Sequence, residues 1–444
     1  MSAQRLDVTA TRLDDAGLGV GVDGERTLHV VDLLPGERAE VVIDHASPHR
    51  AEAWARIVKR LGTASPDRAE PVCPAFGRCG GCTWQHLAYP AQLEAKRARV
   101  VAAVGELGQV APCVPSPRLE GYRNKGKYVA GSAGGHVVLG AYAPRTHIVI
   151  DTLGCRVVAP IIDEVASWAR GAAESAELVP YDERARTGEL RYVIVRESAG
   201  DVLVALVVVG STPRPKLERV ASALAKHPAV RGVVAIINDR RDGAIVPAGS
   251  RPQTLLGHGH LVEDLAGVPV EVGAGEFLQV NRAQATALYA RVAALAEAAP
   301  GLRAVELFAG LGGIGLSLAR AGVAVIAVEI EHEAVAQLRR AAEQAGLPLT
   351  AIAADAGEVR RDQLGDPDVV VVDPPRKGLS ESARALLLAL APRTIVYVSC
   401  GPESLARDLR ALVDARYAVD AIEPWDLMPG TSQVETLVRL RRLA

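Results

Sequence analysis

Residues 304–315 read Ala-Val-Glu-Leu-Phe-Ala-Gly-Leu-Gly-Gly-Ile-Gly, and this stretch decides how the last third of the chain folds. Its apolar start, Ala304–Phe308, is typical of a buried strand, and the residues after the glycines resume helical spacing. Glycines let the backbone turn sharply and come close to a ligand. A nucleoside binds at such a strand-to-helix turn in a parallel sheet, although the turn alone is a weak signal.

The residues on both sides of this turn predict a doubly wound α/β domain. Continuous β-branched runs bounded by Gly or Pro are typical of parallel strands buried on both faces. The predicted strands, separated by helical segments, are Ala304–Phe308, Ala324–Glu329, Leu349–Ala353, Val369–Asp373 and Thr394–Ser399. A helix capped by Asn281 is expected to lead into this domain.

Three acidic residues at strand ends indicate the ligand. Glu329 lies about twenty residues after the glycines, where an acid accepts both ribose hydroxyls. Asp355 follows the third strand, near the expected adenine, and Asp373-Pro-Pro375 suits a planar substrate beside a methyl donor. The chain has no Walker lysine, and its glycine spacing departs from the dinucleotide pattern. The sequence therefore favours S-adenosylmethionine over NAD or a triphosphate.

A thiol and a carboxylate complete the predicted active site. Cys400 ends the strand Thr394–Ser399, and a helix is expected to begin near Glu403, so its N-terminus should lower the thiol pKa. Glu435 starts the last apolar strand, where an acid is costly unless paired or functional. A thiolate that adds to C6 of uracil activates C5 for methylation, and a base must then remove the C5 proton. A small buried cysteine and a solvated glutamate remain the plain alternatives.

A second group of cysteines lies in a Gly- and Pro-rich loop. Cys73, Cys79 and Cys82 are close in sequence, and Cys155 is the available fourth thiol. In a reducing compartment this pattern indicates metal or iron–sulfur ligation rather than disulfides. Four thiolates can hold either [4Fe–4S] or Zn, and the spacing does not decide between them.

The rest of the chain adds two predicted domains and a basic segment. Short strands with glycine turns, the first at Gln4–Thr9, suggest a small β-barrel before residue 62. The middle of the chain alternates strands with two helices near 161–176 and 215–226, an α+β pattern. Between residues 118 and 147 cations alternate with aromatic residues that could contact phosphates and unpaired bases. The residues concerned are Arg118, Tyr122, Arg123, Lys125, Lys127, Tyr128, Tyr142 and Arg145.

Composition excludes several protein classes. The net charge of −2 gives no global argument for a polyanion partner, and six cysteines are too few for a disulfide scaffold. The apolar runs are far shorter than a membrane span, and the first residues show no secretory signal. The expected location is cytoplasmic, with no membrane association and no obligate protein partner evident.

Taken together, these residues resemble the RNA 5-methyluridine methyltransferases that carry an iron–sulfur cluster and an N-terminal TRAM domain. The resemblance covers nearly the whole chain. Its motifs, in chain order, are Leu34-Pro-Gly-Glu37, the four cysteines, Tyr122-Arg-Asn-Lys125, Phe277-Leu-Gln-Val-Asn281, the glycine turn, Ser399-Cys-Gly-Pro402 and Val434-Glu-Thr436.

The resemblance implies three domains and a set of site residues. These are an OB-like TRAM barrel (1–61), a central α+β domain with the cluster and an RNA-binding surface (62–275), and a Rossmann-like class I methyltransferase domain (276–444). Cys73, Cys79, Cys82 and Cys155 would ligate [4Fe–4S], Cys400 would be the nucleophile and Glu435 the general base. The expected contacts to S-adenosylmethionine or the substrate are Gln279, Phe308, Gly310, Gly313, Glu329, Asp355 and Asp373. The partner would be structured RNA with an exposed uridine, ribosomal RNA being favoured and tRNA the second choice.

The chain departs from that family at three places. Gly313 and Gly401 stand where Asn is common, and Met428–Gln433 replaces the usual Phe-Pro-x-Thr followed by His. Two other functions stay open. Asp373-Pro-Pro375 resembles the loop of amino-group methyltransferases, although Arg376 stands where they have an aromatic residue. A non-catalytic RNA-binding protein on the same fold is the third.

Overall fold

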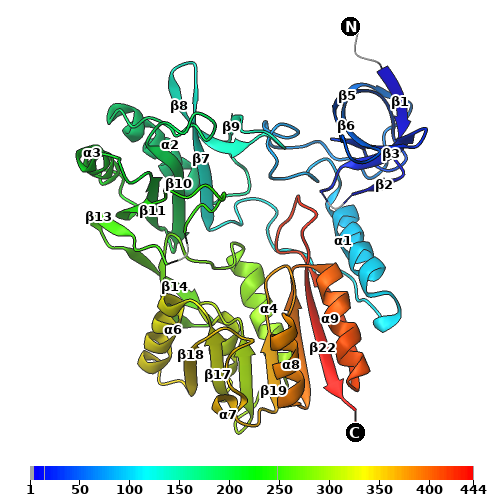
Figure 1. Cartoon of the computed structure of the whole chain (residues 1–444), viewed down its shortest axis with the longest axis vertical. Coiled ribbons are helices and arrows are strands. Elements are labelled where there is room, and N and C mark those ends of the chain that lie inside the picture. Colours follow the sequence, from blue (N-terminus) through cyan, green and yellow to red (C-terminus); the bar gives the residue numbers. More distant parts are fainter. Residues whose placement is uncertain (1–4, 15, 248, 444) are drawn as a thin grey trace.

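The computed structural model describes residues 5–14, 16–247 and 249–443. Its strands form four sheets, of six, seven, two and seven strands. Figure 1 shows three parts that follow one another along the chain and surround the centre of the molecule. None of the helices in the described ranges has both the length and the hydrophobicity needed to cross a bilayer.

The N-terminal part is a six-stranded sheet in the order β1-β5-β6-β4-β3-β2, which curls round on itself in Figure 1. Its strands are β1 (Arg5–Thr9), β2 (Arg12–Leu13), β3 (Gly19–Asp23), β4 (Arg26–Val30), β5 (Arg38–Ala46) and β6 (Glu52–Leu61). The strand predicted over Gln4–Thr9 is β1, and Gln4 lies outside the described residues. Small aliphatic side chains such as Leu28, Val41 and Ala53 fill the interior of the curl.

The middle part has a seven-stranded sheet in the order β13-β12-β11-β10-β7-β8-β9, with a separate β14–β15 hairpin. The strands are β7 (Lys125–Ala133), β8 (His136–Tyr142), β9 (Val149–Asp151), β10 (Leu190–Ser198), β11 (Asp201–Val208), β12 (Val230–Ile237), β13 (Gln253–Gly257), β14 (His260–Leu265) and β15 (Val268–Gly273). Helices α2 (Pro160–Ser175) and α3 (Arg214–Leu224) pack on the seven-stranded sheet. Both predicted helices of this part are therefore confirmed.

The C-terminal part is the predicted doubly wound α/β sheet, in the order β18-β17-β16-β19-β20-β22-β21. Its first five strands are parallel: β16 (Arg303–Leu307), β17 (Ala324–Glu329), β18 (Leu349–Ala353), β19 (Val369–Val372) and β20 (Thr394–Ser399). An antiparallel pair, β21 (Tyr417–Trp425) and β22 (Glu435–Arg442), completes the sheet beside β20. The helices are α4 (Arg282–Leu295), α5 (Gly313–Arg320), α6 (His332–Gln344), α7 (Arg361–Leu364), α8 (Glu381–Leu390) and α9 (Pro402–Asp414).

Helix α1 (Tyr89–Val104), followed by a 3-10 turn (Gly105–Leu107), lies in the predicted middle part of the sequence but packs against the C-terminal sheet. Its residues Val100 and Val104 are buried in the same core as Leu405 and Leu409 of α9. Figure 1 shows α1 and α9 side by side at the outer face of β22. The chain therefore contributes one helix to the C-terminal part before the strands of the middle part begin.

Candidate active site

The C-terminal sheet aligns the ends of four strands at one edge. In the parallel register Leu307 lies beside both Val328 and Val372, and Val372 lies beside Tyr397. The glycine turn, Glu329, Asp373 and Cys400 follow or end these strands, so they lie at the same edge. Ligands of open α/β sheets bind in the crevice outside this edge.

The glycine turn has the backbone of a ligand-binding loop. Phe308 has a φ of 66°, which is unusual for a bulky residue and is typical of functional sites. Gly310 donates its amide hydrogen to Oε2 of Glu329 at 2.8 Å, which fixes that carboxylate beside the turn. Gly312, with a φ of 80°, precedes helix α5 and directs its N-terminus toward the crevice.

The predicted nucleophile and base lie next to one cross-strand pair. Ser399, the last residue of β20, pairs with Thr436 on β22. Cys400 follows Ser399 directly, and Glu435 precedes Thr436 as the first residue of β22. Cys400 and Glu435 therefore share one site with Asp373, and the pKa of the Cys400 thiol responds to both carboxyl groups.

Burial dominates the acid–base properties of this site. It raises the pKa of Asp373 to about 7 and, with help from nearby Asp373, that of Glu435 to about 8. It also raises the pKa of Glu306 on β16 to about 8, and one oxygen of that carboxyl has no hydrogen-bond partner among the described residues. A carboxyl group acts as a general base only in its ionised form, so Asp373 is about half available at neutral pH and Glu435 becomes more available as the pH rises through 8.

The prediction that the helix N-terminus lowers the thiol pKa of Cys400 is wrong. Burial and the two neighbouring carboxyls raise this pKa to about 11 and outweigh Arg376, which lowers it. Helix α9 does begin beside the thiol, at Pro402. Its dipole falls off within the first turn and does not compensate for the low local dielectric.

Two hydrogen bonds of Arg376 hold the loop that follows Asp373. Arg376 donates a 2.7 Å hydrogen bond to Gln433, and its carbonyl oxygen accepts one from Ser404 at 2.9 Å. A side chain at Gly401 would lie 2.9 Å from that same carbonyl, so the close approach explains why glycine stands here. The cation of Arg376 is thereby held between the Asp373 loop and the segment before Glu435.

Two predicted contact residues lie on either side of the crevice. Asp355 is exposed after β18, where its carboxylate accepts a 2.7 Å bond from the amide of Gly357. Gln279 precedes α4, and its carbonyl oxygen accepts a 3.4 Å bond from Asn124. Asn281 caps α4 by accepting from the amide of Gln284, as predicted. These contacts place Gln279 where the middle and C-terminal parts meet.

The four grouped cysteines line one cavity of about 610 Å³, whose other lining residues come from the middle part and from Met428 of the C-terminal part. All of them are free thiols, and burial raises the pKa of Cys82 to about 11. The cavity is also lined by Arg123, Lys125 and Lys127. Within the described ranges, no three His, Cys, Asp or Glu side chains are arranged to hold a metal ion. The four thiols thus surround one cavity, but in the described part of the chain they do not form a preformed site for a single metal ion.

Only some residues of the predicted basic surface are exposed. Tyr122 and Tyr128 are 5% and 3% exposed, and Lys125 is buried with its ammonium donating to the carbonyl of Glu276 at 2.8 Å. The prediction that they contact bases is therefore wrong, because these positions face the protein interior. Lys127 and Arg145 are exposed, and Arg145 lies over the ring of Trp54 at 4.6 Å.

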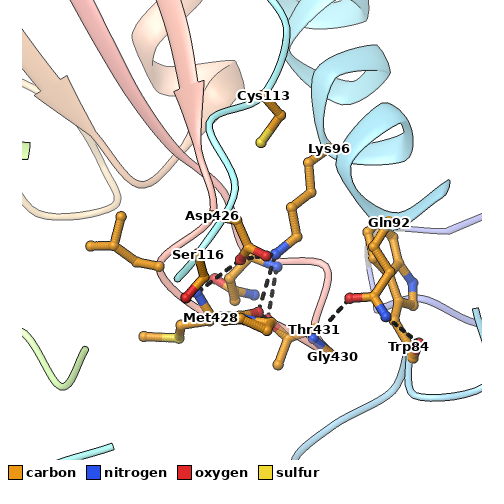
Figure 2. Close-up of polar contacts among 12 residues, drawn as sticks. Trp84, Gln92, Lys96, Cys113, Ser116, Asp426, Met428, Gly430 and Thr431 are labelled. Atoms are coloured by element: carbon orange, nitrogen blue, oxygen red, sulfur yellow. Dashed lines mark hydrogen bonds and ion pairs between the residues drawn. The ribbon is translucent and has the colours of Figure 1, made fainter. Parts of the chain in front are cut away.

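The segment 426–434, between β21 and β22, connects the cysteine cavity to Glu435. Figure 2 shows Asp426 at its start, where the carboxylate accepts from the Lys96 ammonium at 2.5 Å. Gly430 in its middle donates to Gln92 at 2.9 Å and accepts from the amide of Trp84 at 2.9 Å. Trp84 follows Cys82 by two residues. One buried segment thus contacts the cysteine loop and ends at the predicted base.

Comparisons with known proteins agree with this geometry. A family model described as tRNA (Uracil-5-)-methyltransferase matches residues 363–443, the region of Asp373, Cys400 and Glu435. An uncharacterized RNA methyltransferase of Halalkalibacterium halodurans is 32% identical over 450 residues, which cover 98% of this chain and 96% of the relative. The chain belongs to the RNA (uracil-5-)-methyltransferase family. It is thus an enzyme that methylates RNA with S-adenosylmethionine as the methyl donor.

Other relatives of this methyltransferase extend the comparison. An uncharacterized RNA methyltransferase of Bacillus cereus is 32% identical over 453 residues, covering 99% of this chain and 97% of the relative. The Pyrococcus abyssi tRNA (uracil-54, C5)-methyltransferase, solved with S-adenosyl-L-homocysteine, has a TM-score of 0.79 and 25% identity. The match covers 98% of this methyltransferase and 99% of the solved chain, so the multi-sheet α/β fold is shared.

Sequence reasoning about this methyltransferase missed Glu306, Tyr289 and the Lys96–Asp426 pair. Glu306 lies inside an apolar strand and is 1% exposed, a pattern that could have marked it. Tyr289 sits on α4 beside the glycine turn, but nothing in its local sequence distinguishes it. The Lys96–Asp426 pair joins residues 330 positions apart, so only the tertiary structure reveals it.

Proposed function

We propose that this enzyme methylates C5 of one specific uridine in RNA through a covalent adduct with Cys400. The observation that carries the proposal is that Cys400, directly after β20, and Glu435, the first residue of β22, lie next to the Ser399–Thr436 pair and near Asp373. An amino-group methyltransferase has no need of a thiol at this position. The match to the family model, residues 363–443, includes both Cys400 and Glu435.

In the proposed reaction the sulfur of Cys400 bonds to C6 of the uracil, and the thiol proton passes to a neighbouring carboxylate. C5 then takes the methyl group from the bound sulfonium, which leaves as the neutral thioether. Glu435 removes the C5 proton, the C6–sulfur bond breaks and the C5–C6 double bond returns. Covalent catalysis of this kind divides one hard step into easier ones. Gln279 and Asp373 hold the edge of the uracil.

The polar side chains of the crevice suit the polar groups of S-adenosylmethionine. Glu329, fixed by the Gly310 amide, would accept the ribose hydroxyls, and exposed Asp355 would meet the adenine. Phe308 and Gly313 would line the turn beside them. When ionised, Glu306, one oxygen of which has no hydrogen-bond partner among the described residues, and nearby Asp373 would favour a cation in this pocket.

We assign the 62–275 domain a [4Fe–4S] cluster held by Cys73, Cys79, Cys82 and Cys155. The support is that the four thiols line one cavity together with the Arg123 cation, which suits an anionic thiolate cluster. Each thiolate would bind its own iron, so the ligands need not converge on a single point. The reaction has no net redox change, and a bound cluster would supply structural support.

Anaerobically purified protein is expected to be brown and to contain iron and sulfide in equal amounts. The Cys82→Ser variant should lose most of this iron, because an alcohol is a poor ligand for iron in a cluster. The matched control is Cys113→Ser, which changes a buried cysteine outside the cavity and should keep the colour. A colourless wild-type protein containing zinc would contradict the assignment.

We further propose that the curled sheet of residues 1–61 is a TRAM domain that binds RNA, and that residues 276–444 form the methyltransferase domain. The enzyme would act in the cytoplasm on structured RNA that exposes one uridine, which must leave its stack to reach Cys400. Ribosomal RNA is the favoured substrate from the sequence. The similarity to the Pyrococcus abyssi enzyme, a tRNA (uracil-54, C5)-methyltransferase, keeps tRNA as the second candidate.

Deletion of the gene is expected to remove one 5-methyluridine from cellular RNA. The measurement is mass spectrometry of nucleosides from separated ribosomal RNA and tRNA, followed by mapping of the site. Re-expression of the wild-type chain should restore the modified base, and the Cys400→Ala chain should not. An unchanged 5-methyluridine content in every RNA fraction would overturn the proposal.

A further inference from the structure

The ring of Tyr289, on helix α4, packs against the first turn of helix α5 at Gly313. A Cβ atom added to Gly313 would lie 2.5 Å from Cε2, 2.6 Å from Cζ and 2.9 Å from the hydroxyl oxygen of Tyr289. The phenol of Tyr289, on α4, therefore occupies the space of a side chain at Gly313. Helix α5 itself starts at the glycine turn where the cofactor is expected.

The hydroxyl of Tyr289 is surrounded by acids but makes no hydrogen bond with any residue that the structure describes. Asp373, Glu306 and Glu435 all lie near it, and with burial they raise the pKa of Tyr289 so that the phenol keeps its proton. Tyr289 is half-buried. Because the side chain is not fully buried, a bound molecule can reach this hydroxyl and become its hydrogen-bond partner.

The chemistry of the surroundings indicates which part of the cofactor lies here. Four acidic side chains, Asp373, Glu306, Glu435 and Glu263, act on Tyr289. In their ionised forms they favour a positively charged ligand, and the amino-acid end of S-adenosylmethionine carries an ammonium next to the sulfonium. Its carboxylate needs a neutral donor in this acidic setting. A protonated phenol can donate to the carboxylate or accept from the ammonium.

We propose that Tyr289 is a cofactor-binding residue whose hydroxyl hydrogen-bonds the amino-acid end of S-adenosylmethionine, in the place that a side chain at Gly313 would take. This inference rests on the proposed cofactor site. It also explains how the enzyme dispenses with a polar side chain at residue 313. The two positions form one unit, in which either residue can supply the polar group but not both.

The test is the affinity for S-adenosyl-L-homocysteine, measured by calorimetry on the full-length protein. Tyr289→Phe keeps the ring and removes the hydroxyl, and it is expected to raise Kd about 5-fold to 10-fold. Its melting temperature should stay close to that of the wild type. The matched control is Tyr181→Phe in the middle part, where the ring packs on Arg191 and affinity should not change.

A pair of variants tests whether the two positions are exchangeable. Gly313→Asn alone should bind S-adenosyl-L-homocysteine at least about 10-fold more weakly, because its side chain meets the Tyr289 ring. Gly313→Asn combined with Tyr289→Ala frees that space and should recover most of the affinity. If Tyr289→Phe binds like the wild type, or the double variant is no better than Gly313→Asn, the inference is overturned. A wild type that fails to bind the ligand would instead overturn the proposed cofactor site.

Discussion

Cys400→Ala is expected to lower the rate of methyl transfer by about four orders of magnitude or more, a loss typical of removing a catalytic nucleophile. Without the thiol, C5 of uracil stays a weak nucleophile even when the methyl donor is in place. The measurement is single-turnover transfer of a radiolabelled methyl group to RNA from cells that lack the protein. Affinity for S-adenosyl-L-homocysteine should be unchanged, since the thiol is assigned to the substrate.

The partner variant Glu435→Gln separates the covalent steps. It should still form the adduct and transfer the methyl group, but it cannot remove the C5 proton, so a protein–RNA complex should persist on a denaturing gel. Adding Cys400→Ala should abolish that complex. Cys113→Ala serves as a control for cysteine loss outside the crevice and should keep most of the activity. Normal turnover by Cys400→Ala would refute the covalent mechanism.

Lys96→Met is expected to destabilise the protein by about 3–5 kcal/mol, because it leaves a buried carboxylate without its cation. Lys96 and Asp426 are both 0% exposed and lie 2.5 Å apart, and the ammonium also donates to the carbonyl of Met428 at 3.1 Å. Burial lowers the pKa of Lys96 even beside this carboxylate, which reflects the cost of placing a charge here. The melting temperature should fall by about 10 °C.

The matched control for this prediction lies on the same helix. Glu94 forms an exposed ion pair with Arg97, and Glu94→Gln should cost less than about 1 kcal/mol. The double variant Lys96→Met with Asp426→Asn should regain part of the loss, since an amide oxygen can still accept from the amide of Met428. Lys96→Met melting at the wild-type temperature would show that the pair contributes little.

Local patterns in the sequence predict the C-terminal sheet well. The runs Leu349–Ala353 and Thr394–Ser399 are observed with the predicted bounds. Thr394–Ser399 is buried along its whole length, as expected of a central parallel strand. The same patterns place Asp373 and Cys400 at one edge. Glu435 joins them through the antiparallel pairing of β20 with β22, and the position of an acid at a strand start anticipated this.

What the sequence does not predict depends on tertiary burial. The pKa of Cys400 rises although a helix begins beside it, because the surrounding carboxyls and the low dielectric are contributed by distant segments. Tyr122 and Tyr128 read as a stacking surface but face the interior, since a strand pattern does not say which face is covered. The packing of α1 in the C-terminal core also has no signal in the local sequence.

The placement of the reacting groups has a consequence for dynamics. Glu435 is the first residue of a strand paired on both sides, by β20 and β21, and Cys400 follows directly after β20. Backbone held in the middle of a sheet cannot swing by several ångströms without breaking the ladder. In the proposed reaction neither group can therefore travel to its target, so we expect the nucleotide to rotate out of its helix to meet them. The slowest step of turnover should then follow how easily the RNA strand unstacks, so a loop that already presents its uridine would react fastest.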